Sequence, residues 1–205
     1  GDHRDLHLSR RRQRQMCIRD RDVGVLALGY AALSNISART QAYPFMEEMS
    51  RYSQAPVAMA TRDRLSMIYL EVVHTESTLT MRRPVGSTLP IHSSAMGRAC
   101  LAAMDVKERE YLFDAIKKRN EDQWPTIKRN LERAIRDYQD YGYCLSLGDW
   151  AKDVNSVAVP LVHPKHGILT FNCGAPSYLL NQEKLENEIG PRLIHMVNNI
   201  AMNLN

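Results

Sequence analysis

The chain has 205 residues, enough for one well-buried domain with an appendage. Hydrophobic residues make up 44% of it and charged residues 24%, which is ordinary for a globular protein. No apolar run approaches the ~18–20 residues of a membrane span, and no secretory signal pattern opens the chain. Of the net charge of +4, residues 1–22 supply three, with seven arginines and four aspartates. The remaining residues are nearly neutral and are not expected to bind nucleic acid by themselves.

Residues 1–22 show neither helical nor strand periodicity. A basic arm that contacts DNA is one interpretation of Arg10-Arg11-Arg12 and Arg14. A disordered leader, or sequence foreign to the natural gene, is favoured, because a domain pattern begins abruptly at Val23. A helix-turn-helix is excluded here, since it needs three amphipathic helices.

Cysteine and histidine spacing predicts neither disulfides nor a metal site. The four cysteines form no CxxC pair, which is typical of reduced thiols in a cytoplasmic protein; they are Cys17, Cys100, Cys144 and Cys173. His163 and His166 have ligand-like spacing, but a solvated hairpin turn is favoured over a metal site. No cofactor is expected.

The first third of the chain predicts two helices and then strands. Apolar spacing places the second helix at Ser37–Gln54, with Phe45, Met49 and Tyr52 on its apolar face and Pro44 in its first turns or bending it. The other elements are a helix at Val23–Ile36, a hairpin of strands at Ala55–Thr61 and Leu65–Val73, and a short strand at Thr78–Arg82.

The rest of the chain also predicts helices and strands that occur in separate groups. The pattern predicts helices at Val106–Lys118 and Ile127–Tyr138, and strands at Tyr143–Leu147, Val154–Val162 and Ile168–Cys173. A last helix carries an apolar stripe at Leu185, Ile189, Leu193, Val197, Ile200 and Leu204. Because hairpins imply antiparallel pairing and helices cluster between the strand groups, the class is α+β.

Residues 86–104, GSTLPIHSSAMGRACLAAM, stand out as a turn followed by a helix of very small residues. The His92-Ser93-Ser94 segment offers capping side chains, and the first turn of such a helix has unpaired amides at the positive end of its dipole. An anion such as a carboxylate suits that position. Tight packing of the helix on a sheet is the other explanation of the small residues, and from this segment alone it is favoured.

Polar residues on the last two strands leave a similar choice open. Thr170 and Asn172 share one face of their strand, while Ser156 and Ala158 share one face of the partner strand. Thr170 and Asn172 would face water, which the strand pattern slightly favours, or they would orient a small ligand in an apolar-walled cavity.

Signatures of catalysis are missing. There is no G-x-S-x-G, P-loop, H-E-x-x-H or glycine-rich dinucleotide loop. Cys173 as a nucleophile is less favoured than an inert buried thiol, and His92 beside Ser93 and Ser94 is better explained by helix capping. No enzyme is predicted, although a small-molecule enzyme remains an alternative.

Several separated motifs resemble the effector-binding domain of IclR-type bacterial transcriptional regulators. They are GSTLPIHSSAMGRACLA at residues 86–102, ALGYAAL at 27–33, SVAVPLV at 156–162 and FNCGAP at 171–176. The resemblance spans residues 23–205 and implies a GAF-like antiparallel sheet flanked by helices, with long N- and C-terminal helices. The family's winged helix-turn-helix is expected before Val23 and is absent from this sequence.

In such regulators a small organic acid lies between the sheet and the start of the signature helix. The resemblance implies that the acid's carboxylate meets the backbone of Ala95, Met96 and Gly97. The matching positions on the strands and their loop are Ser146, Asp149, Ser156, Asn172 and Gly174. Because Leu147-Gly148-Asp149-Trp150 departs from the family's usual glutamate-bearing loop, recognition by Ser146 and Asp149 is the weakest of these expectations.

The resemblance also implies partners. The short sequences ALGYA and SAMGRA are most similar to those of members that regulate aromatic-acid catabolism. The expected effector is therefore a small carboxylate, such as an aromatic acid or its catabolite. Homo-dimers or tetramers are expected, with DNA contacted only through the absent domain and no membrane contact. A GAF-like sensor from another signalling protein is the remaining alternative.

Overall fold

A computed structural model describes residues 24–25, 27–31, 33–34, 36–74 and 83–204. The chain divides into two units, residues 1–37 and 38–205, and each is considered by itself. In the first unit, the described positions from 24 to 34 are helical, as predicted for that segment. The predicted strand at Thr78–Arg82 lies outside the described residues.

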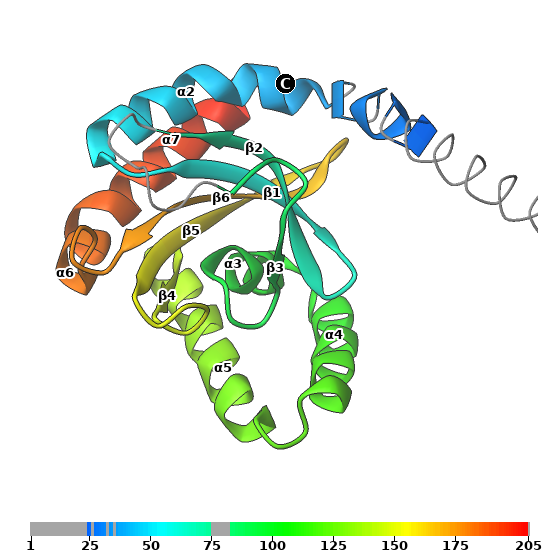
Figure 1. The fold of residues 1–205 in the computed structure, drawn as a ribbon. Helices are drawn as coiled ribbons and strands as arrows, with labels where there is room; N and C mark the ends of the chain where they lie inside the picture. The colour runs from blue at the N-terminus through cyan, green and yellow to red at the C-terminus, as the bar shows by residue number, and fades with distance from the viewer. Residues whose placement is uncertain (1–23, 26, 32, 35, 75–82, 205) are drawn as a thin grey trace, which may run out of the picture. The chain divides into compact units, whose positions relative to one another are not determined.

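The second unit is built on a curled antiparallel sheet of six strands, in the order β3-β2-β1-β6-β5-β4 (Figure 1). The strands are β1 Val57–Asp63, β2 Ser66–Val73, β3 Thr88–Pro90, β4 Cys144–Leu147, β5 Val154–His163 and β6 Gly167–Pro176. All neighbours pair antiparallel, which confirms the predicted α+β class and both long hairpins.

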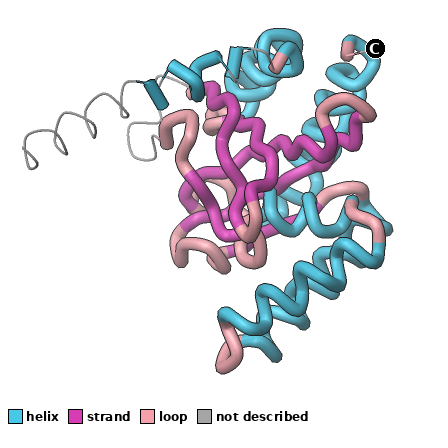
Figure 2. The backbone as a smooth tube through the Cα atoms, turned by 90° about the vertical axis from the view of Figure 1, so that its right-hand side faces the viewer, coloured by secondary structure: helices cyan, strands magenta, loops and turns pink. Residues whose placement is uncertain are grey.

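Helices cover both faces of this sheet. One face carries α2 (Ser37–Ser53) and α7 (Gly190–Asn203), and the other carries α3 (Ala95–Ala103), as Figure 1 shows. On the α3 side, α4 (Val106–Arg119) and α5 (Trp124–Tyr141) complete the layer. Figure 2 shows from a second direction that the strands lie between helices. None of the helices in the described ranges is long and apolar enough to cross a membrane.

The C-terminal stripe packs as predicted, although its helix is not uniform. All six stripe residues, from Leu185 to Leu204, are buried. The segment begins with α6 (Gln182–Lys184), passes through a π-helical turn, η1 (Leu185–Ile189), and continues as α7. Leu185 in the π turn and Leu193 in α7 are both fully buried.

Two predictions of local structure are wrong in detail. Of the predicted apolar residues of α2, Met49 is buried as expected, whereas Tyr52 is 41% exposed; the rest of the buried face consists of small residues and a methionine, including Ala42 and Met46. Small side chains let α2 lie close to its neighbours, and the larger Tyr52 is turned outward. The turn expected at Gly86 is present, but it leads into a short strand, β3, that was not predicted; Leu89 of this strand pairs with Met67 and is buried.

The first turn of α3 lies in direct contact with the backbone that precedes it. Ser94 caps the helix, and its hydroxyl oxygen accepts a hydrogen bond from the Gly97 amide at 3.1 Å. A Cβ atom built on Gly97 would lie 2.0 Å from the carbonyl oxygen of Ile91. Because that neighbour is backbone, it cannot turn aside as a side chain would. Glycine is therefore required here for packing.

We expect Gly97→Ala to lower the free energy of unfolding by about 3 kcal/mol or more, since the first turn of α3 must separate from Ile91. Urea denaturation measures this loss. Gly29→Ala is the matched control, because nothing lies within 4 Å of a Cβ at Gly29. Equal stability of the two variants would show that the contact at Gly97 is not needed.

Candidate functional site

A cavity of about 50 Å³ lies between the sheet and the start of α3. Four of the residues that the sequence singled out line it together, namely Ala95, Ser156, Asn172 and Gly174. They come from α3, β5 and β6, so the fold brings into one wall positions that are far apart in the chain. The other lining residues are Pro56, Ala58, Tyr69, Val72, His74, Arg83, Leu89, Ser94, Trp150 and Val154.

The helix start supplies backbone donors to this region. The Ser94 hydroxyl donates to the carbonyl oxygen of Pro90 at 2.7 Å while accepting from Gly97. Among the hydrogen bonds of the described residues, none uses the amides of Ala95 or Met96. These two amides therefore remain the donors at the positive end of the α3 dipole.

The strand residues in the wall are held by regular pairing. Asn172 lies on β6 between Ala58 of β1 and Ala158 of β5, and small neighbours leave room for its amide. Asn172 is only 8% exposed, and Thr170 is fully buried with its hydroxyl donating to Ala60. The slightly favoured expectation that they face water is therefore wrong, because α3 covers this face of the sheet.

Gly174 keeps space open beside Ser156. The two residues are paired across β5 and β6, and a Cβ atom on Gly174 would lie 2.9 Å from the Ser156 Cβ. A larger residue at position 174 would push Ser156 away from the cavity wall. The glycine therefore helps to set the width of the site.

The remaining candidate residues do not line the cavity. Met96 and Gly97 are buried in the packing of α3. Ser146 is buried, and its hydroxyl donates to the carbonyl oxygen of Ser93 at 2.8 Å. Asp149 accepts a hydrogen bond from Arg98 at 2.8 Å. Ser146 and Asp149 therefore support the helix start from outside the cavity.

Arg98 is a buried cation that was not among the predicted site residues. Its side chain is 2% exposed, whereas that of its partner Asp149 is 25% exposed. The Nη1 atom donates both to Asp149 and to the carbonyl oxygen of Leu145, and Nε donates to that of His92. The sequence does show a single arginine within the otherwise uncharged helix AMGRACLAA. Because a buried charge needs dedicated partners, this arginine could have been identified as a residue with a specific role.

Three further wall residues, Tyr69, Arg83 and Trp150, were also missed. The Arg83 guanidinium lies 4.5 Å from the centre of the Trp150 ring, a cation–π contact. Burial raises the pKa of Tyr69 to about 12, so its hydroxyl stays protonated and can donate a hydrogen bond. They lie in three separate segments, and no short motif connects them.

The described thiols and histidines offer no activated nucleophile or metal cluster. Burial raises the pKa of Cys173 to about 11 and that of Cys100 to about 12, which keeps both thiols protonated. His163 and His166 stack with their ring centres 4.9 Å apart. Within the described ranges, no three metal-ligating side chains gather at one place. Burial, and then the charge of Arg98, lowers the pKa of His92.

Residues 30–202 match a family model described as the bacterial transcriptional regulator IclR C-terminal. The chain belongs to this family. The HTH-type transcriptional regulator TsaQ1/TsaQ2 of Comamonas testosteroni is 32% identical over 179 residues, covering 86% of this chain and 64% of that protein. The chain thus spans less than two thirds of the length of this relative.

Solved structures agree with the IclR assignment. An IclR family transcriptional regulator from Brucella abortus is 57% identical, with a TM-score of 0.86, covering 89% of this chain and 69% of that chain. A double mutant of the PobR inducer binding domain from Acinetobacter, in complex with 3-hydroxybenzoic acid, is 16% identical with a TM-score of 0.64. It covers 80% of this chain and 97% of that domain, and at this identity the likeness shows the fold alone.

We expect Asp149→Asn to lower the free energy of unfolding by about 1–2 kcal/mol, because it leaves the buried Arg98 guanidinium without its counter-charge. The loss is moderate because water reaches Asp149. Urea denaturation is the measurement, with Asp153→Asn in the same loop as the control. If both variants are equally stable, the ion pair does not hold the loop against α3.

Proposed function

We propose that this domain senses a small organic acid for a transcriptional regulator, and that the acid occupies the cavity between the sheet and the start of α3. The proposal rests on one observation: three kinds of chemical group border the same cavity. The backbone at Ala95, the polar side chains of Ser156 and Asn172, and the apolar surface of Leu89 and Val72 border the same space. Few polar groups within apolar walls are typical of a small-molecule site.

The charge in this wall favours an anion. The amides of Ala95 and Met96 stand at the positive end of α3, and a carboxylate oxygen accepts hydrogen bonds from such amides. Arg83, from the segment before β3, adds a full positive charge to the wall. In this proposal the carboxylate meets the helix start, while Ser156, Asn172 and the Tyr69 hydroxyl contact the polar groups on the rest of the molecule.

The size of the cavity adds a condition to this proposal. A volume of about 50 Å³ is smaller than an aromatic acid requires, so the wall has to move outward on binding. The Arg83–Trp150 contact is the part of the wall made by two side chains rather than by the sheet. Its separation would enlarge the cavity and expose an indole face to the ligand ring. The 3-hydroxybenzoic acid in the PobR complex supports aromatic acids as the first class to test.

The proposal extends to the intact regulator. Effector binding would change how attached DNA-binding domains are spaced in a dimer or tetramer, a coupling between two sites. Self-association has a candidate surface in Val25, Leu28 and Tyr30, which are 67–75% exposed in the N-terminal helix. Such a regulator would act in the cytoplasm, without a cofactor and without turning over its effector. Family membership favours this function over an enzyme or an unrelated sensor.

A thermal-shift screen against benzoate, hydroxybenzoates, pyruvate and glyoxylate tests the proposal. An acid at 100 times its Kd should stabilise the domain by ~2.7 kcal/mol, which raises its Tm by roughly 5–11 °C. We expect Asn172→Leu and Ser156→Val each to abolish the shift, because they remove polar contacts from the cavity wall.

The matched control is Asn198→Leu on the exposed part of α7, which should leave the shift unchanged. A folded domain that responds to no acid, or whose response survives both cavity variants, would contradict the proposal.

A further inference from the structure

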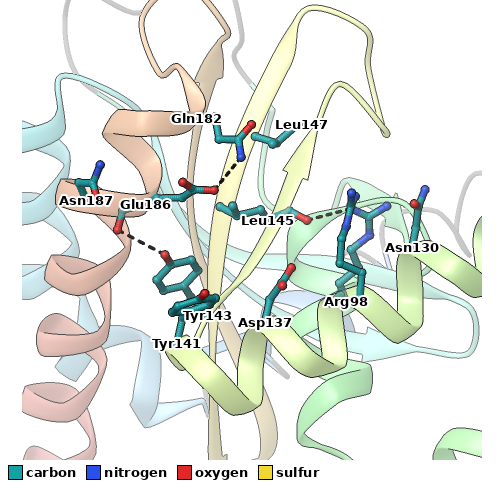
Figure 3. A pocket seen from close by; sticks show the side chains of 12 residues that line it. Arg98, Asn130, Asp137, Tyr141, Tyr143, Leu145, Leu147, Gln182, Glu186 and Asn187 are labelled. Carbon is teal, nitrogen blue, oxygen red and sulfur yellow. Dashed lines mark hydrogen bonds between the residues drawn. The ribbon is translucent and has the colours of Figure 1, made fainter.

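A second and larger cavity lies on the other side of Arg98. It measures about 520 Å³ and is bordered by α5, by the edge strand β4 and by the α6–η1 segment (Figure 3). It shares no lining residue with the smaller cavity. Its volume lies within the range typical of small-molecule sites.

Arg98 brings a buried positive charge to this cavity. A guanidinium has five N–H donors, and the hydrogen bonds to His92, Leu145 and Asp149 use three of them. Within the described part of the chain, the two donors on Nη2 have no hydrogen-bond partner. Arg98 lines the cavity although only 2% of its side chain is exposed, so an occupant meets this charge through a small part of the guanidinium, where solvent screening is weak.

Charged groups of both signs border this cavity. Figure 3 shows Arg98 and Asn130 at one end and Gln182, Glu186 and Asn187 at the other, with Leu145 and Asp137 between them. Arg133 follows Asn130 by three residues on α5, so both lie on the same face of that helix. One end therefore offers the guanidinium groups of Arg98 and Arg133, and the other offers the Glu186 carboxylate. The Asp137 carboxylate, which interacts with Arg98 and Arg133, lies between the two ends, and amide groups line both of them.

We propose that this cavity binds a zwitterionic small molecule, an α-amino acid or a derivative that keeps both charged groups. Its carboxylate pairs with Arg98 and Arg133, and its ammonium group donates to Glu186. The Glu186 carboxylate is held in place by a hydrogen bond, since Gln182 Nε2 donates to its Oε1 atom at 2.7 Å. Leu145, Leu147 and the ring of Tyr141 give the walls apolar surface for a side chain. Charge at both ends selects against plain acids and plain amines.

The test is calorimetric titration of the intact chain with each of the twenty protein amino acids, up to about 10 mM. For the tightest ligand, the analogue without the ammonium group and the analogue without the carboxylate are titrated next. We expect each analogue to bind at least about tenfold more weakly, which corresponds to about 1.4 kcal/mol. Binding of no amino acid, or equal binding of an analogue, would overturn the proposal.

Variants then locate the ligand. Arg133→Gln and Glu186→Gln should each weaken binding about tenfold or more, because each removes one charged partner. Arg136→Gln on α5 and Glu183→Gln on α6 are the matched controls outside the cavity lining, and they should change affinity less than about twofold. Asn172→Leu should leave amino-acid binding intact. Binding that is lost in Asn172→Leu and kept in the Arg133 and Glu186 variants would place the ligand in the smaller cavity and overturn the proposal.

Discussion

The close approach of Gly97 to the backbone of Ile91 is the constraint on which the rest of the domain depends. It holds the first turn of α3 against the segment that links β3 to the helix. With that turn fixed, Ser94 can cap the helix and Ala95 borders the small cavity. Three residues further on, Arg98 reaches the opposite side and borders the large cavity. One short helix therefore presents a different residue to each of two cavities.

The Arg98–Asp149 ion pair joins this helix to the β4–β5 loop. Burying a guanidinium is unfavourable unless its donors are satisfied, and here two backbone carbonyls and one carboxylate serve that purpose. Asp149 directly precedes Trp150, whose ring contacts Arg83 in the wall of the small cavity. One ion pair and one loop therefore connect residues in the walls of the two cavities.

Local periodicity predicted much of this fold because its elements are strongly patterned. The stripe from Leu185 to Leu204 and both long hairpins follow from side-chain spacing alone. Strand alternation also placed Thr170 and Asn172 on one face correctly. It could not show that α3 covers that face, because burial depends on packing between distant segments. For the same reason β3, only three residues long, gave no signal.

The candidate site was predictable only in part. Ala95, Ser156, Asn172 and Gly174 sit in motifs that resemble those of a known family, and they meet in one cavity wall. Tyr69, Arg83 and Trp150 lie in separate segments and become neighbours only when the sheet curls around α3. Arg98 was visible as a charge in a helix of small residues, but its three partners come from elsewhere in the chain.

The most direct test of the central claim is a crystal structure of the domain with the acid that stabilises it most. The account predicts that the carboxylate oxygens lie within hydrogen-bond distance, about 3 Å, of the Ala95 and Met96 amides. It also predicts that the rest of the molecule contacts Asn172 and Ser156, with Arg83 and Trp150 moved apart. An acid bound elsewhere, or one whose carboxylate turns away from the start of α3, would contradict the account.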